Sequence, residues 1–404
     1  MFVLGPVSRG TRGAPPSKAA RWYDCAVNRR RAPLIGAVLL LLPLFAACVS
    51  VTNPDGWAAP VIDGQDVYVS SSKGHISAVT LQDDTTATAR WTFPDKDIDA
   101  DDKIDPEAIY GDPVIDGDRV YIATFSAGVF ALNTEDGRPV WPANGTNSGK
   151  ISGNIAGGLA LANGVLYFGT TEGRLYAWNA SDGTPAWPRP REFDRGIWAT
   201  PVVVGDTLFV ATMGGELHAL SLADGSPVWP APFVATGAIA DLYPLDQGRL
   251  FVPSINRHVY IVNAADGAVL ADFRARDWVW TQPAATGSEV YFGDFGGHVY
   301  GLDITNGASP TWEPASVEGE RVKAGAAIVG DVLVIADRKP VVTFIDATNG
   351  QVLNRVPIPD AGTVRSNVHA ADGFAYILTT KGRLFRANPE NYSVVEIVLN
   401  GVKK

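Results

Sequence analysis

The chain has 404 residues, of which 46% are hydrophobic, and it carries a formal net charge of -10. A chain of this length can build a large core by packing alone, and its acidic balance argues against nonspecific nucleic-acid binding. The 42 Gly and 28 Pro residues are typical of a fold made of short strands and tight turns.

Residues 1–48 form a leader that precedes the fold. A basic cluster at residues 28–31 is followed by an apolar run at residues 33–47, which is too short for a comfortable membrane span. The run ends in Ala46-Ala47-Cys48, which resembles the lipobox of bacterial lipoproteins. In lipoproteins this cysteine becomes the lipidated first residue, so the resemblance implies export and a lipid anchor at Cys48. Ordinary signal cleavage and an uncleaved anchor are the alternatives.

Both cysteines of the chain, Cys25 and Cys48, lie in this leader. The remaining residues, 49–404, therefore have no disulfide and no thiol chemistry. We expect them to form one domain, the domain that carries the repeats described next.

A short pattern of strand, turn, strand, Asp-Gly turn and strand recurs eight times along residues 49–404. Its clearest copies run over residues 120–141, 166–187 and 208–229. The first interval between copies is 53 residues and the others are 40 to 46 residues. A fixed period of this length with strand-like repeats predicts an all-β fold, an eight-bladed β-propeller with four antiparallel strands per blade. The second residue of each copy is Tyr68, Tyr121, Tyr167, Phe209, Phe251, Tyr291, Val334 or Tyr376.

The third copy illustrates how a repeat builds a blade. Residues 165–169 and 174–178 read as two neighbouring strands, and a preceding strand is expected within residues 156–162. Asp182-Gly183 is a hairpin signal because this pair tolerates positive φ. The outer strand is expected to end at Trp187.

A tryptophan recurs at the end of five repeats, where it would wedge between neighbouring blades. The fifth and seventh repeats have Ala271 and Asn354 at this position, so we expect weaker contacts there. The five tryptophans are Trp91, Trp141, Trp187, Trp229 and Trp312.

The phrases at residues 131–141 and 177–187, Ala-x-Asn-x-x-Asp-Gly-x-x-x-Trp, resemble the repeat of the PQQ-like propeller family. The resemblance covers about residues 57–400. The family includes the quinoprotein dehydrogenases and BamB, the propeller lipoproteins of the outer-membrane β-barrel assembly machinery. The resemblance implies the propeller fold, and it does not by itself choose between the two functions.

The residues argue against an enzyme. Quinoprotein dehydrogenases typically use a vicinal cysteine pair and a calcium site beside the quinone, and no motif here matches either. We therefore expect no catalytic residues and no PQQ. His75, His258 and His298 share one repeat position on different blades, so they are not expected to converge on a metal.

One acidic segment, residues 95–107, accounts for the long first interval. Its alternating carboxylates offer oxygen ligands of the kind that calcium takes. Asp97, Asp99 and Asp101 are therefore calcium candidates, and a solvated acidic loop is the alternative.

Two sets of residues are candidates for partner binding. The first is an aromatic-x-x-Pro phrase before the innermost strand, which would place rings around one mouth of the central channel or pack them under their own blades. The second consists of loops that join the outer strand of one blade to the next blade and share one face. The first set is Trp57, Tyr110, Trp198 and Trp280, and the second is Arg189, Arg191, Arg195, Arg274, Arg276 and Trp278.

These observations together predict a noncatalytic, lipid-anchored envelope scaffold that binds other proteins, with a role like that of BamB in envelope assembly. A propeller that binds a quinone or another small ligand in its channel is the alternative. An extracellular adhesion or polysaccharide-binding propeller is a third hypothesis.

Residues 1–26 make the leader unusually long, and a start at Val27 would leave a short, well-formed signal. We therefore expect translation to begin at Val27. Mass spectrometry of the intact cellular precursor should find no peptide from residues 1–26, and detection of one would refute this hypothesis.

Overall fold

The computed structural model describes residues 55–95, 104–142, 147–239, 241–317 and 321–402. All of these residues belong to the unit Val51–Lys404. Cys48, Asp97, Asp99 and Asp101 lie outside the described residues. Among the residues described, no helix has the length and hydropathy of a membrane span.

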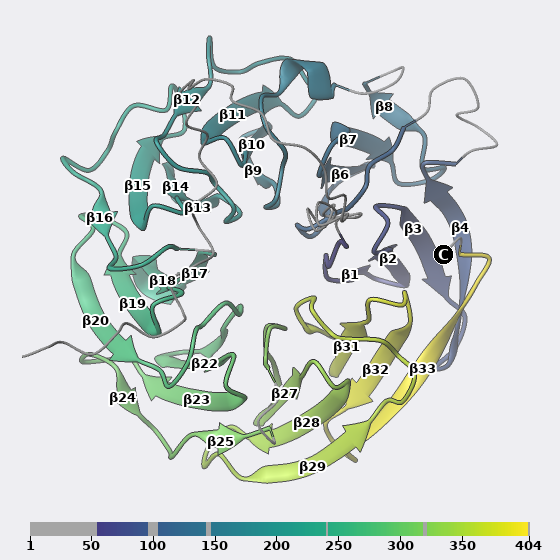
Figure 1. Cartoon of the computed structure of the whole chain (residues 1–404). Coiled ribbons are helices and arrows are strands. Elements are labelled where there is room, and N and C mark those ends of the chain that lie inside the picture. Colours follow the sequence, from purple (N-terminus) through teal and green to yellow (C-terminus); the bar gives the residue numbers. More distant parts are fainter. Residues whose placement is uncertain (1–54, 96–103, 143–146, 240, 318–320, 403–404) are drawn as a thin grey trace, which may run out of the picture. The chain divides into compact units, whose positions relative to one another are not determined.

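The unit is built from antiparallel sheets that follow one another in chain order around a common centre (Figure 1). Five sheets have four strands each, and one has five. The seventh has eight strands, because two four-stranded antiparallel arrays are joined by parallel pairing of β33 with β4. The all-β architecture with four-stranded sheets agrees with the expectation from the repeats, although the sheets number seven and not eight.

The eight-stranded sheet contains β1 (Val61–Asp63), β2 (Asp66–Ser70), β3 (Ile76–Leu81), β4 (Thr86–Phe93), β33 (Ser393–Asn400), β32 (Leu384–Asn388), β31 (Phe374–Leu378) and β30 (His369–Ala371). The next two sheets are β5 (Val114–Asp116), β6 (Arg119–Thr124), β7 (Gly128–Asn133) and β8 (Pro139–Trp141), then β9 (Ala160–Ala162), β10 (Val165–Gly169), β11 (Arg174–Asn179) and β12 (Arg191–Glu192). These are followed by β13 (Val202–Val204), β14 (Thr207–Ala211), β15 (Glu216–Ser221) and β16 (Phe233–Val234).

The following sheet consists of β17 (Tyr243–Leu245), β18 (Arg249–Pro253), β19 (His258–Asn263) and β20 (Val269–Arg274). The five-stranded sheet contains β21 (Ala284–Thr286), β22 (Glu289–Gly293), β23 (His298–Asp303), β24 (Ser309–Pro310) and β25 (Ala315–Ser316). The last sheet is β26 (Ala327–Val329), β27 (Val332–Ala336), β28 (Val341–Asp346) and β29 (Val352–Pro357). The described residues also form two short 3-10 helices, η1 (Ser148–Lys150) and η2 (Asp246–Gly248).

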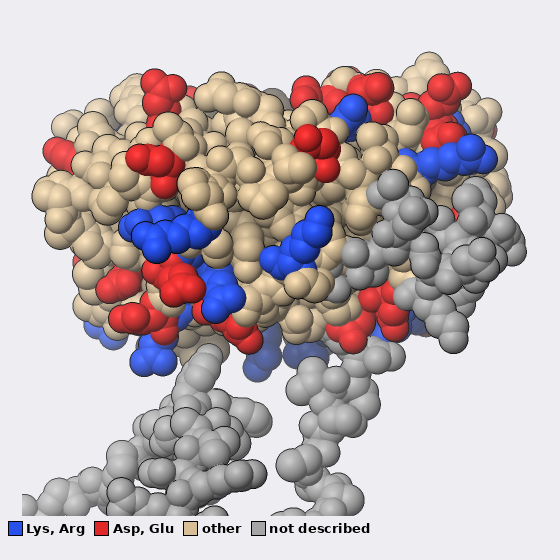
Figure 2. Space-filling view, turned by 90° about the horizontal axis from the view of Figure 1, so that it is seen from above, with Lys and Arg blue, Asp and Glu red and all other residues tan. Residues whose placement is uncertain are grey.

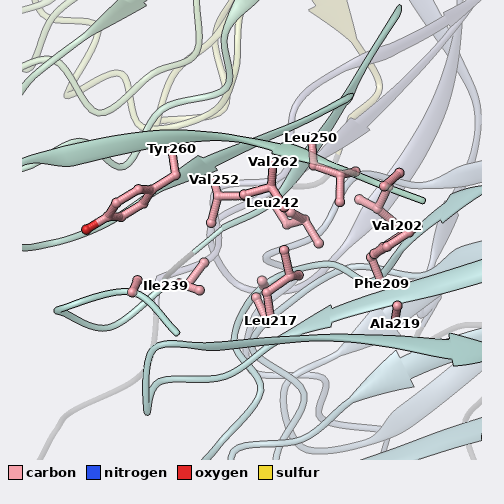
Figure 3. Close-up of a cluster of buried hydrophobic side chains, with 14 of the residues drawn as sticks. Val202, Phe209, Leu217, Ala219, Ile239, Leu242, Leu250, Val252, Tyr260 and Val262 are labelled. Carbon is pink, nitrogen blue, oxygen red and sulfur yellow. The ribbon is translucent and has the colours of Figure 1, made fainter. Parts of the chain in front are cut away.

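The second and third strands of the repeats, such as β10 and β11, are largely buried on both faces, because neighbouring sheets pack on each side. This explains why β10 and β14 are hydrophobic runs without strict alternation. Figure 3 shows one such contact, where Val202, Phe209 and Leu217 meet Leu250 and Val262 of the next sheet.

The outer strand of the third repeat lies later in the chain than expected. The sequence predicts that it ends at Trp187, but Pro185 makes only an isolated bridge with Trp178, and the paired strand is β12. Pro188 and Pro190 follow the tryptophan, and proline has no N–H to donate to a ladder. The fourth repeat behaves in the same way, with a bridge at Pro227 and the outer strand at β16.

The five repeated tryptophans are buried, and each is held by the next repeat. Trp141 is 5% exposed and donates from Nε1 to the carbonyl oxygen of Ala180 at 2.8 Å. Its ring also lies directly under Gly183, in the Asp-Gly turn of that repeat. The same Nε1 hydrogen bond recurs at Trp91, Trp187, Trp229 and Trp312, over 2.9 to 3.1 Å. We call this contact the tryptophan clasp.

Gly183 and Gly164 make a matched pair for testing the clasp, because both have positive φ (69° and 72°) in the same sheet. A Cβ on Gly183 would lie 2.6 Å from the Trp141 ring, whereas one on Gly164 meets nothing within 4 Å. Both substitutions to Ala cost the left-handed strain of about 1–2 kcal/mol. Gly183→Ala should cost a further ~1–3 kcal/mol because the ring must shift. Urea denaturation measures this difference, and equal losses in the two variants would contradict the clasp.

Candidate functional site

A cavity of about 290 Å³ lies where the inner strands of several sheets begin. We call it the central recess. Its lining brings together residues that are far apart in the sequence. They include Trp57, Tyr110, Asp112, Asp241, Tyr243, Trp280, Lys323, Arg365 and Asn367.

The predicted aromatic residues do converge on this site. The rings of Trp57 and Tyr110 lie 4.3 Å apart between centroids. Trp280 lies 6.4 Å from Trp198, which is outside the lining and is 40% exposed. Three of the four predicted aromatics therefore line the recess, and the fourth packs against one of them.

A lysine that the aromatic-x-x-Pro phrase does not include links these rings. Lys323 Nζ lies 3.2 Å from the ring centroid of Trp57 and 5.1 Å from that of Trp280. An ammonium group over a tryptophan face is attracted by the negative potential of the ring. Residues from the first, sixth and seventh repeats therefore meet at one cation.

The position of Lys323 follows from the repeat. Apart from Trp57, which follows Gly56, the rings and cations at this position come directly after a buried β-branched residue that precedes the inner strand. The pairs are Ile109-Tyr110, Ile197-Trp198, Val279-Trp280, Val322-Lys323 and Val364-Arg365. The sequence search for aromatic-x-x-Pro missed Lys323 and Arg365 because both the aromatic and the proline are absent there. Their spacing of 42 residues, at the position of the aromatics, is the signal that would have found them.

Lys323 and Asp241 are both perturbed by their surroundings. Burial lowers the pKa of Lys323 to about 7, the charge of Arg365 lowers it further, and Asp241 acts in the opposite direction. Burial raises the pKa of Asp241 to about 6, against the effect of hydrogen bonds from the Tyr243 hydroxyl and the Leu242 N–H. The recess therefore contains an acid and a base that both titrate near neutral pH.

The other ionisable groups of the lining are also shifted. Burial raises the pKa of Tyr110 to about 12 and that of Tyr243 well above its usual value. The Asp112 residue is exposed as a whole, but desolvation of its carboxyl group by the surrounding protein raises the pKa of that group. That carboxylate accepts a hydrogen bond of 2.6 Å from the Ala59 N–H, which favours its charged form.

The second predicted set of residues lies outside the recess lining. Arg189, Arg195, Arg274 and Arg276 are exposed, whereas Arg191 is partly buried in β12. Trp278 is 49% exposed and packs against Phe295 at 6.4 Å. In Figure 2, charged side chains of both signs are interspersed over the side that is shown.

The predicted calcium ligands cannot be placed, because they lie outside the described residues. Within the described ranges, no group of three or more His, Cys, Asp and Glu side chains is arranged to hold a metal ion. His258 and His298 lie on separate sheets and contact separate carboxylates, Asp272 and Asp294.

Lys323 makes the electrostatics of the recess testable through stability. Its pKa is about 7 in the folded chain and 10.5 as an isolated side chain, so the unfolded chain binds more protons between these values. Stability should therefore rise between about pH 7 and pH 9, and Lys323→Met should show a smaller rise. Urea denaturation at the two pH values measures this. The exposed Lys150→Met is the control and should behave like the parent, and an unchanged rise in Lys323→Met would contradict the assignment.

Many solved structures share the fold, and three of them align as follows. A computationally designed protein, Ika8, aligns with a TM-score of 0.64 at 13% identity, over 85% of this chain and 97% of that one. BamB from Moraxella catarrhalis aligns with a TM-score of 0.63 at 16% identity, over 81% and 93% of the two chains. Quinohemoprotein alcohol dehydrogenase from Comamonas testosteroni aligns with a TM-score of 0.61 at 14% identity, over 81% and 70%.

No curated protein matches the chain significantly. A family model described as outer membrane protein assembly factor BamB does match, over residues 131–232, 188–245 and 232–398. These matches extend over more than half of the chain. The chain therefore belongs to the family of PQQ-like propellers that this BamB model describes.

Proposed function

We propose that the chain is a noncatalytic envelope lipoprotein scaffold with a role like that of BamB in the assembly of outer-membrane or other envelope proteins. The observation that carries the proposal is the match to the BamB family model over residues 131–398. In this proposal the chain is exported and anchored by a lipid at Cys48. The anchor places it in the periplasm at the outer membrane, or at the cell surface.

We further infer that the propeller has eight blades. The eight-stranded sheet then represents the first and last blades, joined by three parallel residue pairs between β33 and β4. This count agrees with eight sequence repeats, and a C-terminal strand that joins the first blade would close the ring.

The partner-binding surface in this proposal is formed by the loops that join the outer strand of one sheet to the inner strand of the next sheet. In an antiparallel four-stranded sheet, these loops lie at the same end as the turns between the second and third strands. The contact between Trp278 and Phe295, which come from one loop of each kind, agrees with this placement. Exposed tryptophan and arginine residues are the side chains that contribute most to protein interfaces, so Trp278, Arg274 and Arg276 are the leading contact residues.

A second candidate function is the binding of a quinone or another small ligand in the central recess. The cavity with aromatic walls and convergent polar groups supports it. The lining does not fit a quinone held by calcium, because it contains two cations beside its two carboxylates and offers no acidic metal cluster among the described residues. We therefore do not propose dehydrogenase activity.

A crosslinking experiment on native membranes tests the scaffold role. A photo-crosslinking residue in place of Trp278 should capture a β-barrel assembly protein or another envelope protein. The same residue in place of Asp206 should not, because Asp206 lies in a turn between the first and second strands, at the opposite end of its sheet. Captured proteins are identified by mass spectrometry.

Cys48→Ser is the control for the anchor, and we expect it to move the protein from the membrane fraction to the soluble fraction. Equal capture from the two crosslinking positions would contradict the contact face. Quinone-dependent dye reduction without any captured envelope protein would contradict the scaffold role and favour the ligand-binding alternative.

A further inference from the structure

The central recess contains two neighbouring cations without anionic partners. Within the described part of the chain, neither Lys323 nor Arg365 forms an ion pair or a conventional hydrogen bond, and Lys323 Nζ lies over two tryptophan rings. The charge of Arg365 acts unfavourably on protonated Lys323. Two like charges held together in a partly buried site are stabilised when an anion binds between them.

The carboxylates of the recess are already engaged by their own chain segments. Asp112 accepts from the Ala59 N–H, and Asp241 accepts from the Tyr243 hydroxyl and from the Leu242 N–H. Neither carboxylate lies within ion-pair distance of a described cation. The two carboxylates therefore contribute negative charge near the cations but form no ion pair with them.

A further donor lines the same cavity. Asn367 accepts from the Gly325 N–H through Oδ1 at 3.0 Å, which identifies its other terminal atom as the NH₂ group. That group has no acceptor among the described residues. The guanidinium of Arg365 can donate two parallel hydrogen bonds to a carboxylate, while Lys323 supplies a point charge.

From this geometry we propose that the central recess is a carboxylate-binding site, in which Lys323 and Arg365 hold the anion and Trp57 and Trp280 pack against the group that carries it. The two nearby aspartates favour a singly charged carboxylate over a phosphate, because they would repel a second negative charge. The cavity of about 290 Å³ is large enough for a side chain or a small organic acid and too small for a folded segment. The inference rests on the recess lining and is independent of the envelope role.

The carboxylate has two possible sources, an acidic segment of a partner protein and a free organic acid. Isothermal titration calorimetry with matched probes distinguishes them. The first probe is the peptide Gly-Gly-Glu-Gly-Gly, blocked at both ends, and its neutral counterpart contains Gln in place of Glu. The second probe is acetate, and acetamide is its neutral counterpart.

At about pH 6.5 the Glu peptide should bind at least about tenfold more tightly than the Gln peptide, as expected for a charge-assisted hydrogen bond. Lys323→Met and Arg365→Met should each remove this preference, whereas Lys150→Met should keep it. Preferential binding of the peptide identifies an acidic segment as the source. Equal binding of acetate identifies a free organic acid.

The affinity should fall as the pH is raised to about 8.5, because Lys323 loses its proton and Asp241 becomes fully ionised. The raised pKa values of Tyr110 and Tyr243 keep both hydroxyl groups neutral over this range. Lys323→Arg should bind the Glu peptide with a weaker pH dependence. Binding by this variant would show that Lys323→Met loses its preference for the Glu peptide because the charge is gone, and not because the protein misfolds. The proposal is overturned if neither anionic probe binds more tightly than its neutral counterpart, or if Lys323→Met binds like the parent.

Discussion

The tryptophan clasp is the contact on which the arrangement of the sheets depends. Each indole fills the space between two sheets, where its truncation would cost about 3–5 kcal/mol. Its Nε1 hydrogen bond also orients the two sheets, because it forms only when the carbonyl oxygen of the neighbouring turn lies within hydrogen-bond distance of the indole. The glycine of that turn is required twice, for its positive φ and for its contact with the ring. One repeated side chain thus sets both the spacing and the register of neighbouring sheets.

The repeats without tryptophan support this interpretation. Ala271 replaces the indole in the fifth repeat, and a Cβ added to Gly307 of the following turn would meet nothing within 4 Å. In the seventh repeat, Asn354 donates to the carbonyl oxygen of Tyr392 at 3.3 Å, and the Tyr392 ring packs on Phe344. The fifth and seventh repeats therefore pack differently from the others, and the seventh has its own substitute for the clasp. That their contacts are weaker stays a prediction.

The repeat made the inner strands and the wedged tryptophans predictable, because each copy repeats the same local pattern of strand residues and turn glycines. The Nε1 hydrogen bond of the clasp was not predicted. Two local features were not predictable from that pattern. The outer strands β12 and β16 begin after a proline-containing bend, and the pairing there depends on where the chain returns to the sheet. Lys323 and Arg365 occupy a repeat position at which only aromatic side chains were expected. Their place in the central recess could be inferred only from their spacing of one and two repeats from Trp280.

Residues at the start of the third strand and residues at the entry to the innermost strand behave differently, because they lie at different distances from the common centre around which the sheets are arranged. His258 and His298 stand at the start of third strands, and each contacts an aspartate of its own sheet. The entry to the innermost strand lies nearest the centre, so residues from distant repeats come into contact there, as Lys323 does with Trp57 and Trp280. Substitutions at the outer positions change single sheets, whereas substitutions at the inner position change one shared site. A propeller can therefore acquire a new binding site by replacing a few inner residues while every clasp is kept.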